Sequence, residues 1–102
     1  MLVKNEKARA VQEARALMKL KTQATLHQIK QAYRDLARDT HPDVHPADEY
    51  EQWAERMREI NEAYKVLMDY CHNYAFSFND EVVEKQCRRQ DFGEYWKAQW
   101  MD

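Results

Sequence analysis

Residues that break helices are scarce in this sequence of 102 residues, which contains one glycine and two prolines. A fold made of short strands needs frequent turns, and glycine and proline supply much of the turn chemistry. The scarcity therefore argues against an all-β fold. Both prolines, Pro42 and Pro46, fall within residues 40–46, whereas the single glycine is Gly93. The first ninety residues thus have one strong backbone break, because each proline fixes its own φ and disfavours the α conformation in the residue before it.

Signals of secretion and of membrane insertion are also missing. The first twenty residues are interspersed with charges, and no run of about 18 apolar residues occurs. The two cysteines, Cys71 and Cys87, are typical of reduced thiols in a cytoplasmic protein, with a single disulfide as the less favoured alternative. The formal net charge of −2 gives no reason to expect binding to nucleic acid. We expect neither a nucleic acid nor a membrane as partner.

No catalytic pattern is recognisable. The sequence has no nucleophile paired with a base and no glycine-rich phosphate loop, so we expect that the protein is not an enzyme. A zinc site is a minor alternative, because the histidines and cysteines lack paired Cys-x-x-Cys or His-x-x-x-His spacing. Its candidate ligands are His41, His45, Cys71, His72 and Cys87. We expect no metal and no cofactor.

What the sequence does contain is helical periodicity. Three segments, at about 4–20, 25–39 and 48–69, have apolar residues recurring at spacings of three and four, which predicts amphipathic helices. The second begins with the capping-box pattern of Thr25 and Gln28. The first carries the apolar face Val11, Ala14, Leu17 and Met18. The second carries Leu26, Ile29, Tyr33 and Leu36. The third carries Tyr50, Trp53, Met57, Ile60, Tyr64 and Leu67.

The second and third predicted helices are joined by the short proline-containing loop. Two such helices pack antiparallel with their apolar stripes facing each other, and the first helix completes the core. The third helix has two plausible starts, a capping box at 48–51 or Pro46 at the first helical position. The sequence therefore predicts an all-α protein built on a helical hairpin.

The C-terminal part is rich in aromatic residues. Residues 70–79 read as a connection, and a short fourth helix is expected at about 80–89, capped by Ser77 or Asn79. The tail beyond it contains Phe92, Tyr95, Trp96 and Trp100. The aromatics from Tyr70 onward either pack over the hairpin, which is the favoured interpretation, or form a patch that binds a client or partner protein.

Three blocks of residues resemble the J-domain, the co-chaperone module of the DnaJ family. The loop contains His41-Pro42-Asp43, the preceding helix reads Ile29-Lys30-Gln31-Ala32-Tyr33-Arg34-Asp35-Leu36-Ala37, and the following helix reads Ile60-Asn61-Glu62-Ala63-Tyr64-Lys65-Val66-Leu67. The resemblance covers about residues 14–69. It suggests a J-domain at 1–72 and a C-terminal extension at 73–102.

The resemblance implies a function and a set of site residues. Proteins of this family dock on a DnaK-type chaperone ATPase and accelerate ATP hydrolysis without doing chemistry themselves. The residues implied in docking are Lys30, Tyr33, Arg34 and Arg38, with Arg58 flanking the site. The residues implied in stimulation are His41, Pro42 and Asp43. Tyr33 also lies in the apolar stripe, which favours a core position with an exposed hydroxyl group.

Some positions depart from the family pattern. Asp35 and Asp39 stand where basic residues are common, and they are candidate intrahelical partners of Arg38 and Arg34. Lys19 stands where a turn glycine is common. No glycine- and phenylalanine-rich linker or cysteine-rich zinc region follows the resembling segment. A full DnaJ-type client-binding architecture is therefore not expected. The alternative function is a helical adaptor that does not stimulate an ATPase and binds another protein through its aromatic tail.

Overall fold

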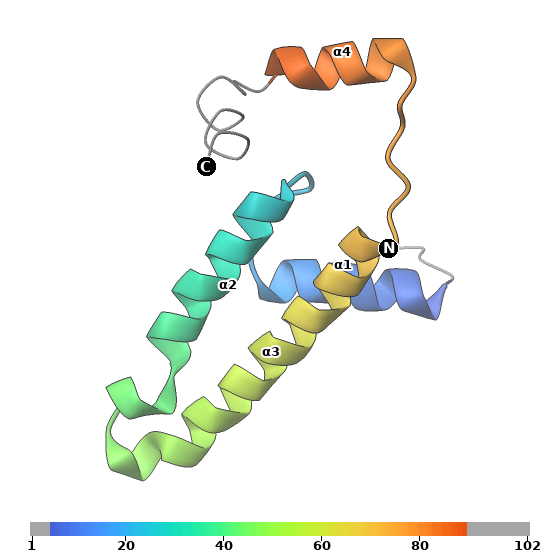
Figure 1. Cartoon of the computed structure of the whole chain (residues 1–102). Helices are drawn as coiled ribbons and strands as arrows, with labels where there is room; N and C mark the ends of the chain where they lie inside the picture. Colours follow the sequence, from blue (N-terminus) through green and yellow to red (C-terminus); the bar gives the residue numbers. More distant parts are fainter. Residues whose placement is uncertain (1–4, 90–102) are drawn as a thin grey trace.

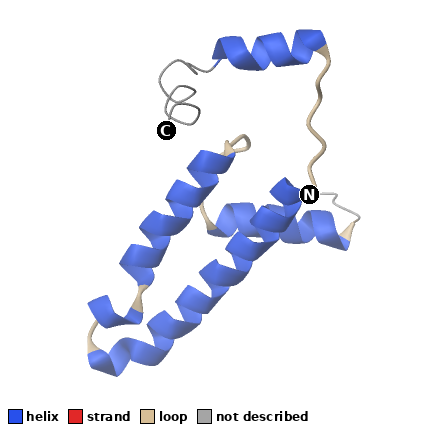
Figure 2. Ribbon diagram, in the orientation of Figure 1, coloured by secondary structure: helices blue, strands red, loops and turns tan. Residues whose placement is uncertain are grey.

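The computed structural model describes residues 5–89, and these residues form helices and loops without a strand (Figure 2). The α-helices are α1 (Glu6–Leu17), α2 (Leu26–Thr40), α3 (Tyr50–His72) and α4 (Asp80–Arg89). Two 3-10 turns, η1 (Pro42–Val44) and η2 (Ala47–Glu49), connect α2 to α3. The predicted all-α class is confirmed.

Helices α2 and α3 run antiparallel, and α1 crosses them at the end opposite the connecting turns (Figure 1). The core lies where these helices meet. Its buried members are Ala14, Met18, Ile29, Ala63 and Leu67. The small side chains of Ala14 on α1 and Ala63 on α3 contribute little volume, which is compatible with close packing of the two helices. Of the predicted apolar faces, the outer members Leu17, Leu26 and Tyr50 are exposed instead.

Helix α1 ends in a turn built around Lys19, which has a φ of 56°. The Lys19 N–H donates to Ala16 O at 3.0 Å, and the Leu20 N–H donates to Arg15 O at 3.1 Å. This pair of bonds is the Schellman motif, in which the residue after the cap takes the left-handed conformation that favours glycine. Arg15 Nη1 also donates to Leu20 O at 2.9 Å, so a side-chain hydrogen bond stabilises the same turn.

The starts of α2 and α3 differ in how well the sequence predicts them. The capping box of Thr25 and Gln28 is present, with the Gln28 N–H donating to Thr25 Oγ1 and the Thr25 N–H donating to Gln28 Oε1. The capping box predicted at 48–51 is wrong. Asp48 lies inside η2 and does not cap the helix, and α3 begins at Tyr50 without a side-chain cap. A capping residue needs an extended backbone, which the 3-10 turn denies to Asp48.

The C-terminal region departs from the favoured prediction that its aromatics belong to the core. Helix α4 has the predicted bounds and is capped by Asn79, whose Oδ1 accepts from the Glu81 N–H at 3.0 Å. The connection before it is extended (Figure 1). Its aromatic residues Tyr74, Phe76 and Phe78 are 54%, 71% and 85% exposed. The aromatic residues of the tail, Phe92, Tyr95, Trp96 and Trp100, lie outside the described residues.

Candidate functional site

The loop between α2 and α3 is ordered by its own hydrogen bonds. His41 precedes η1, and its Nδ1 accepts a hydrogen bond from the Asp43 N–H at 3.1 Å. The Val44 N–H donates to His41 O at 3.1 Å, and the His45 N–H donates to Pro42 O at 3.2 Å. Pro42 stands at the start of the turn, where its missing N–H removes no helical bond. The loop is therefore a short, rigid turn whose conformation is set before any partner binds.

The three residues of the predicted His-Pro-Asp site differ in their exposure to solvent. Pro42 is buried, as is its neighbour Thr40, whereas His41 and Asp43 are exposed. Asp43 Oδ2 lies 3.7 Å from His41 Nδ1. Because Nδ1 accepts from the Asp43 N–H, we assign the proton of the neutral His41 ring to Nε2. The turn thus presents an N–H donor and a carboxylate to solvent from one fixed backbone.

A stacked pair of rings ties this loop to α3. The rings of His45 and Trp53 are parallel to within 3°, with their centroids 3.5 Å apart. His45 Nε2 lies 2.8 Å from Asp39 O, near the end of α2. Trp53 Nε1 donates to Glu49 Oε1 at 3.0 Å. One histidine therefore joins the end of α2, the loop and the first turn of α3. No pattern in the sequence indicates this brace, although Trp53 belongs to the predicted apolar stripe of the third helix.

The cations predicted for docking lie on one side of α2 but differ in their partners. Lys30, Arg34 and Arg38 are four residues apart, so they share a face of the helix. Arg38 is bound within the helix, with Nη2 3.1 Å from Asp35 Oδ1 and Nε 3.9 Å from Asp39 Oδ1. Both acidic residues thus pair with Arg38, and neither pairs with Arg34. Among residues 5–89, Lys30 and Arg34 have no ion-pair partner and are exposed.

Tyr33 belongs to the hairpin interface. Its ring stacks on Tyr64 of α3 with centroids 4.0 Å apart, and it packs against the core cluster. Its hydroxyl donates to Asn61 Oδ1 at 2.6 Å, so the expected exposed hydroxyl is in fact paired across the hairpin. A stack and a hydrogen bond at one residue fix the register of α2 against α3. Tyr33 therefore positions the charged face of α2 relative to the loop.

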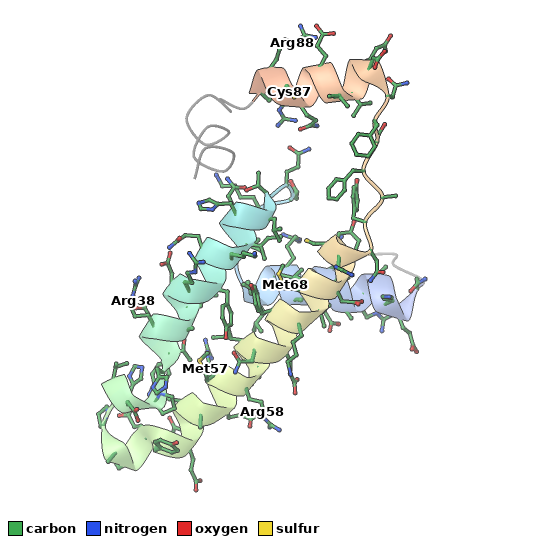
Figure 3. All side chains as sticks on the ribbon, in the orientation of Figure 1. Arg38, Met57, Arg58, Met68, Cys87 and Arg88 are labelled. Atoms are coloured by element: carbon green, nitrogen blue, oxygen red, sulfur yellow. The ribbon has the colours of Figure 1, made fainter. Side chains whose placement is uncertain are left out.

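Arg58 is separated from the charged face of α2. Its guanidinium donates to the carboxylate of Glu55 one turn earlier on α3. That hydrogen bond, with the charges of Glu55, Glu62 and Glu59, raises the pKa of Arg58 above its usual value. In Figure 3 the side chains of Arg58 and Arg38 point to opposite sides of the hairpin. The predicted role of Arg58 beside the site thus receives no support from its placement.

The histidines and cysteines do not assemble into a metal centre in the part of the chain that the structure describes. No group of three or more His, Cys, Asp or Glu side chains in residues 5–89 is arranged to hold a metal ion. Cys71 and Cys87 are free thiols, the first half-buried and the second exposed. Burial raises the pKa of the Cys71 thiol. None of the described helices is long and apolar enough to cross a membrane.

The sequence matches a known domain family and several known proteins. The family model described as the DnaJ domain matches residues 5–73. The chain is 36% identical over 94 residues to the chloroplastic Chaperone protein dnaJ 20 of Arabidopsis thaliana, covering 74% of this chain and 44% of that protein. It is 34% identical over 84 residues to Chaperone protein DnaJ of Synechococcus elongatus, covering 82% of this chain and 24% of that protein.

A third relative is Chaperone protein DnaJ of Carboxydothermus hydrogenoformans, 49% identical over 70 residues, with 69% of this chain and 14% of the relative covered. The chain thus spans less than half the length of each of these three relatives. No solved structure matches it.

Proposed function

Because the chain belongs to the DnaJ domain family, we propose that it is a co-chaperone that docks on a DnaK-type chaperone and stimulates its ATP hydrolysis through His41, Pro42 and Asp43. The observation that carries the proposal is the division of labour within the loop. Pro42 is buried and fixes the turn, while His41 and Asp43 are exposed on either side of it. A carboxylate on a rigid turn loses little conformational entropy when it pairs with a cation of the partner.

Delivery of the loop is assigned to the charged face of α2. Lys30 and Arg34 are exposed and have no ion-pair partner among the described residues, so their field is available to an acidic surface on the ATPase. Charges of this kind raise association rates more than they raise equilibrium affinity. Arg38 contributes less in this proposal, because Asp35 and Asp39 neutralise it within the helix.

In this role the chain performs no chemistry itself. It changes the rate of the partner's reaction and requires no cofactor or metal of its own. We expect neither a nucleic acid nor a membrane as partner. We place the protein in the cytoplasm, where two free thiols would remain reduced.

The test is the ATP turnover of a purified DnaK-type chaperone titrated with this protein. Wild type should raise the turnover in a saturable manner, and His41→Gln should abolish the increase while leaving the helical circular dichroism unchanged. Lys30→Glu should raise the concentration needed for half-maximal stimulation, whereas Lys65→Glu, an exposed lysine on α3, is the matched charge control. A turnover that wild type leaves unchanged with several such chaperones would overturn the proposal.

A second candidate function is favoured by the exposed aromatic residues of the connection. In the adaptor alternative, the chain binds another protein through its C-terminal part without stimulating an ATPase. The exposure of Tyr74, Phe76 and Phe78 supports a binding role for this region. Phe92, Tyr95, Trp96 and Trp100 remain predicted contact residues for a client or partner. A wild-type protein that is inert toward every DnaK-type chaperone yet binds another protein would favour this candidate.

A further inference from the structure

The connection between α3 and α4 is a stretched-out segment that belongs to no helix (Figure 1). Residues 74–78 read Tyr-Ala-Phe-Ser-Phe and are extended between the C-terminal cap of α3 at Asn73 and the N-terminal cap of α4 at Asn79. In an extended chain, residues two apart share one face. This alternation assigns Tyr74, Phe76 and Phe78 to one face. The rings of Tyr74 and Phe76 are neighbours with centroids 5.6 Å apart, and the Tyr74 ring also meets Tyr70 of α3 at 5.8 Å.

Beyond the Tyr74 N–H, which donates to Cys71 O at 3.2 Å, the backbone of this segment is unpaired within the described chain. From Ala75 to Phe78, no backbone N–H or C=O group exchanges a backbone hydrogen bond with another residue of 5–89. No strand is present among those residues that would supply one. The segment thus combines open backbone hydrogen-bonding groups with three exposed apolar side chains on one face, which are the two features used when a peptide adds to a sheet edge.

We propose that residues 74–78 are a recognition segment that adds as an extra strand to the open sheet edge of a partner protein. The backbone would pair with the edge strand, and the rings of Tyr74, Phe76 and Phe78 would enter apolar pockets beside it. A second copy of this chain is a poorer partner, because a ribbon of two isolated short strands is only marginally stable in water. The partner must therefore bring a sheet that is already formed.

The distribution of charge around the segment indicates which kind of partner surface it would fit. Residues 73–79 are uncharged in a chain of which 33% of the residues are charged. The first turn of α4 follows at once with Asp80 and Glu81, neither of which has an ion-pair partner among the described residues. The matching surface is an apolar edge with basic residues beyond the end that meets α4. Its affinity should fall as salt rises, because exposed charge pairs are screened.

The segment lies at the opposite end of α3 from the His41 loop. A helix of 23 residues is about 34 Å long, so both surfaces can be occupied together. The inference thus goes beyond the proposed co-chaperone function and does not depend on it. The His41→Gln variant should lose stimulation and keep binding through residues 74–78.

The experiment places the photo-crosslinking residue p-benzoylphenylalanine at Phe76 of the full chain, expressed in the cells that encode it. The matched control carries the same residue at Tyr50, another exposed aromatic position. We expect a cross-linked partner at about ten times the yield of the control, with the cross-link mapped by mass spectrometry to an edge strand of a sheet. Cross-links to a helix, to this chain itself or to a second copy would overturn the proposal, as would equal yields at both positions.

Further variants test the alternation and the backbone pairing. With the probe moved to Phe78, Phe76→Ser should lower the cross-link yield about tenfold, because it removes a ring from the apolar face. Ser77→Ala, on the opposite face, should leave the yield unchanged. In the purified complex, amide hydrogen exchange within 75–78 should slow at alternate residues. Equal losses for the two variants, or unchanged exchange, would contradict strand addition.

Discussion

Replacing Lys19 by glycine should make the protein more stable, although it removes a side chain. Lys19 occupies the left-handed position of the turn that ends α1, with a φ of 56°. A residue with a Cβ pays about 1–2 kcal/mol in this conformation, and glycine does not. Glycine is also more flexible in the unfolded chain, which offsets about 0.5–1 kcal/mol of the gain. The net expectation is an increase of about 0.5–1 kcal/mol in the free energy of unfolding.

Little else should change at this position. Lys19 is exposed and forms no ion pair with a described residue, so losing its charge costs little. The two backbone hydrogen bonds of the turn, to Ala16 O and Arg15 O, do not involve its side chain. Lys19→Ala is the matched control, because alanine removes the charge but keeps the Cβ. Its stability should be close to that of wild type.

The assay is thermal unfolding followed by circular dichroism at 222 nm, with urea unfolding as an independent measure. For a domain of this size, about 1 kcal/mol corresponds to a Tm shift of about 4–8 °C. We therefore expect Lys19→Gly to unfold about 2–8 °C above Lys19→Ala. A glycine variant that unfolds at or below the temperature of the alanine variant would refute the assignment of backbone strain to Lys19.

Three further predictions concern the loop, the charged face of α2 and the thiols. Trp53→Ala should lower the free energy of unfolding by about 1–2 kcal/mol and should also lower the ATPase stimulation. Trp53→Phe should keep most of the stimulation, because a ring still stacks on His45 of the loop. Equal stimulation by the two variants would contradict a role for the His45–Trp53 stack. Asp35→Asn should leave Arg38 with only its longer contact to Asp39, and the lost negative charge should raise the association rate with a DnaK-type chaperone about two- to threefold at low salt. An increase that persists at high salt would contradict an electrostatic cause. With an aromatic disulfide reagent near pH 8, Cys87 should react at least about tenfold faster than Cys71. Burial shields the Cys71 thiol and raises its pKa, so less of it is thiolate at this pH. Equal rates would contradict the burial of Cys71.

The parts of the fold that follow from short stretches of sequence were predictable. The hairpin followed from the spacing of apolar residues, and the start of α2 followed from the pair Thr25 and Gln28, because a capping box is specified within four residues. The start of α3 was not predicted correctly. The sequence offered two competing starts, Pro46 and a capping box at 48–51. The 3-10 turn at 47–49 separates Pro46 from α3 and includes Asp48, so neither residue begins or caps that helix.

The interactions that position the site were beyond the reach of sequence patterns. The stack of His45 on Trp53 and the bond from Tyr33 to Asn61 join residues on different elements. Both depend on the register of α2 against α3, which periodicity alone leaves open. Asp35 and Asp39 pair with Arg38 and not with Arg34. This pairing depends on side-chain rotamers, which the spacing of residues along a helix does not specify.

The most direct test of the central claim is single-turnover ATP hydrolysis by a DnaK-type chaperone, measured with wild type and with Asp43→Asn. The substitution removes the exposed negative charge but keeps the side-chain size and the N–H that donates to His41 Nδ1. The account predicts that wild type accelerates hydrolysis and that Asp43→Asn does not, at equal helical content. Equal acceleration by the two proteins would contradict the claim that the Asp43 carboxylate, presented by this turn, carries the stimulation.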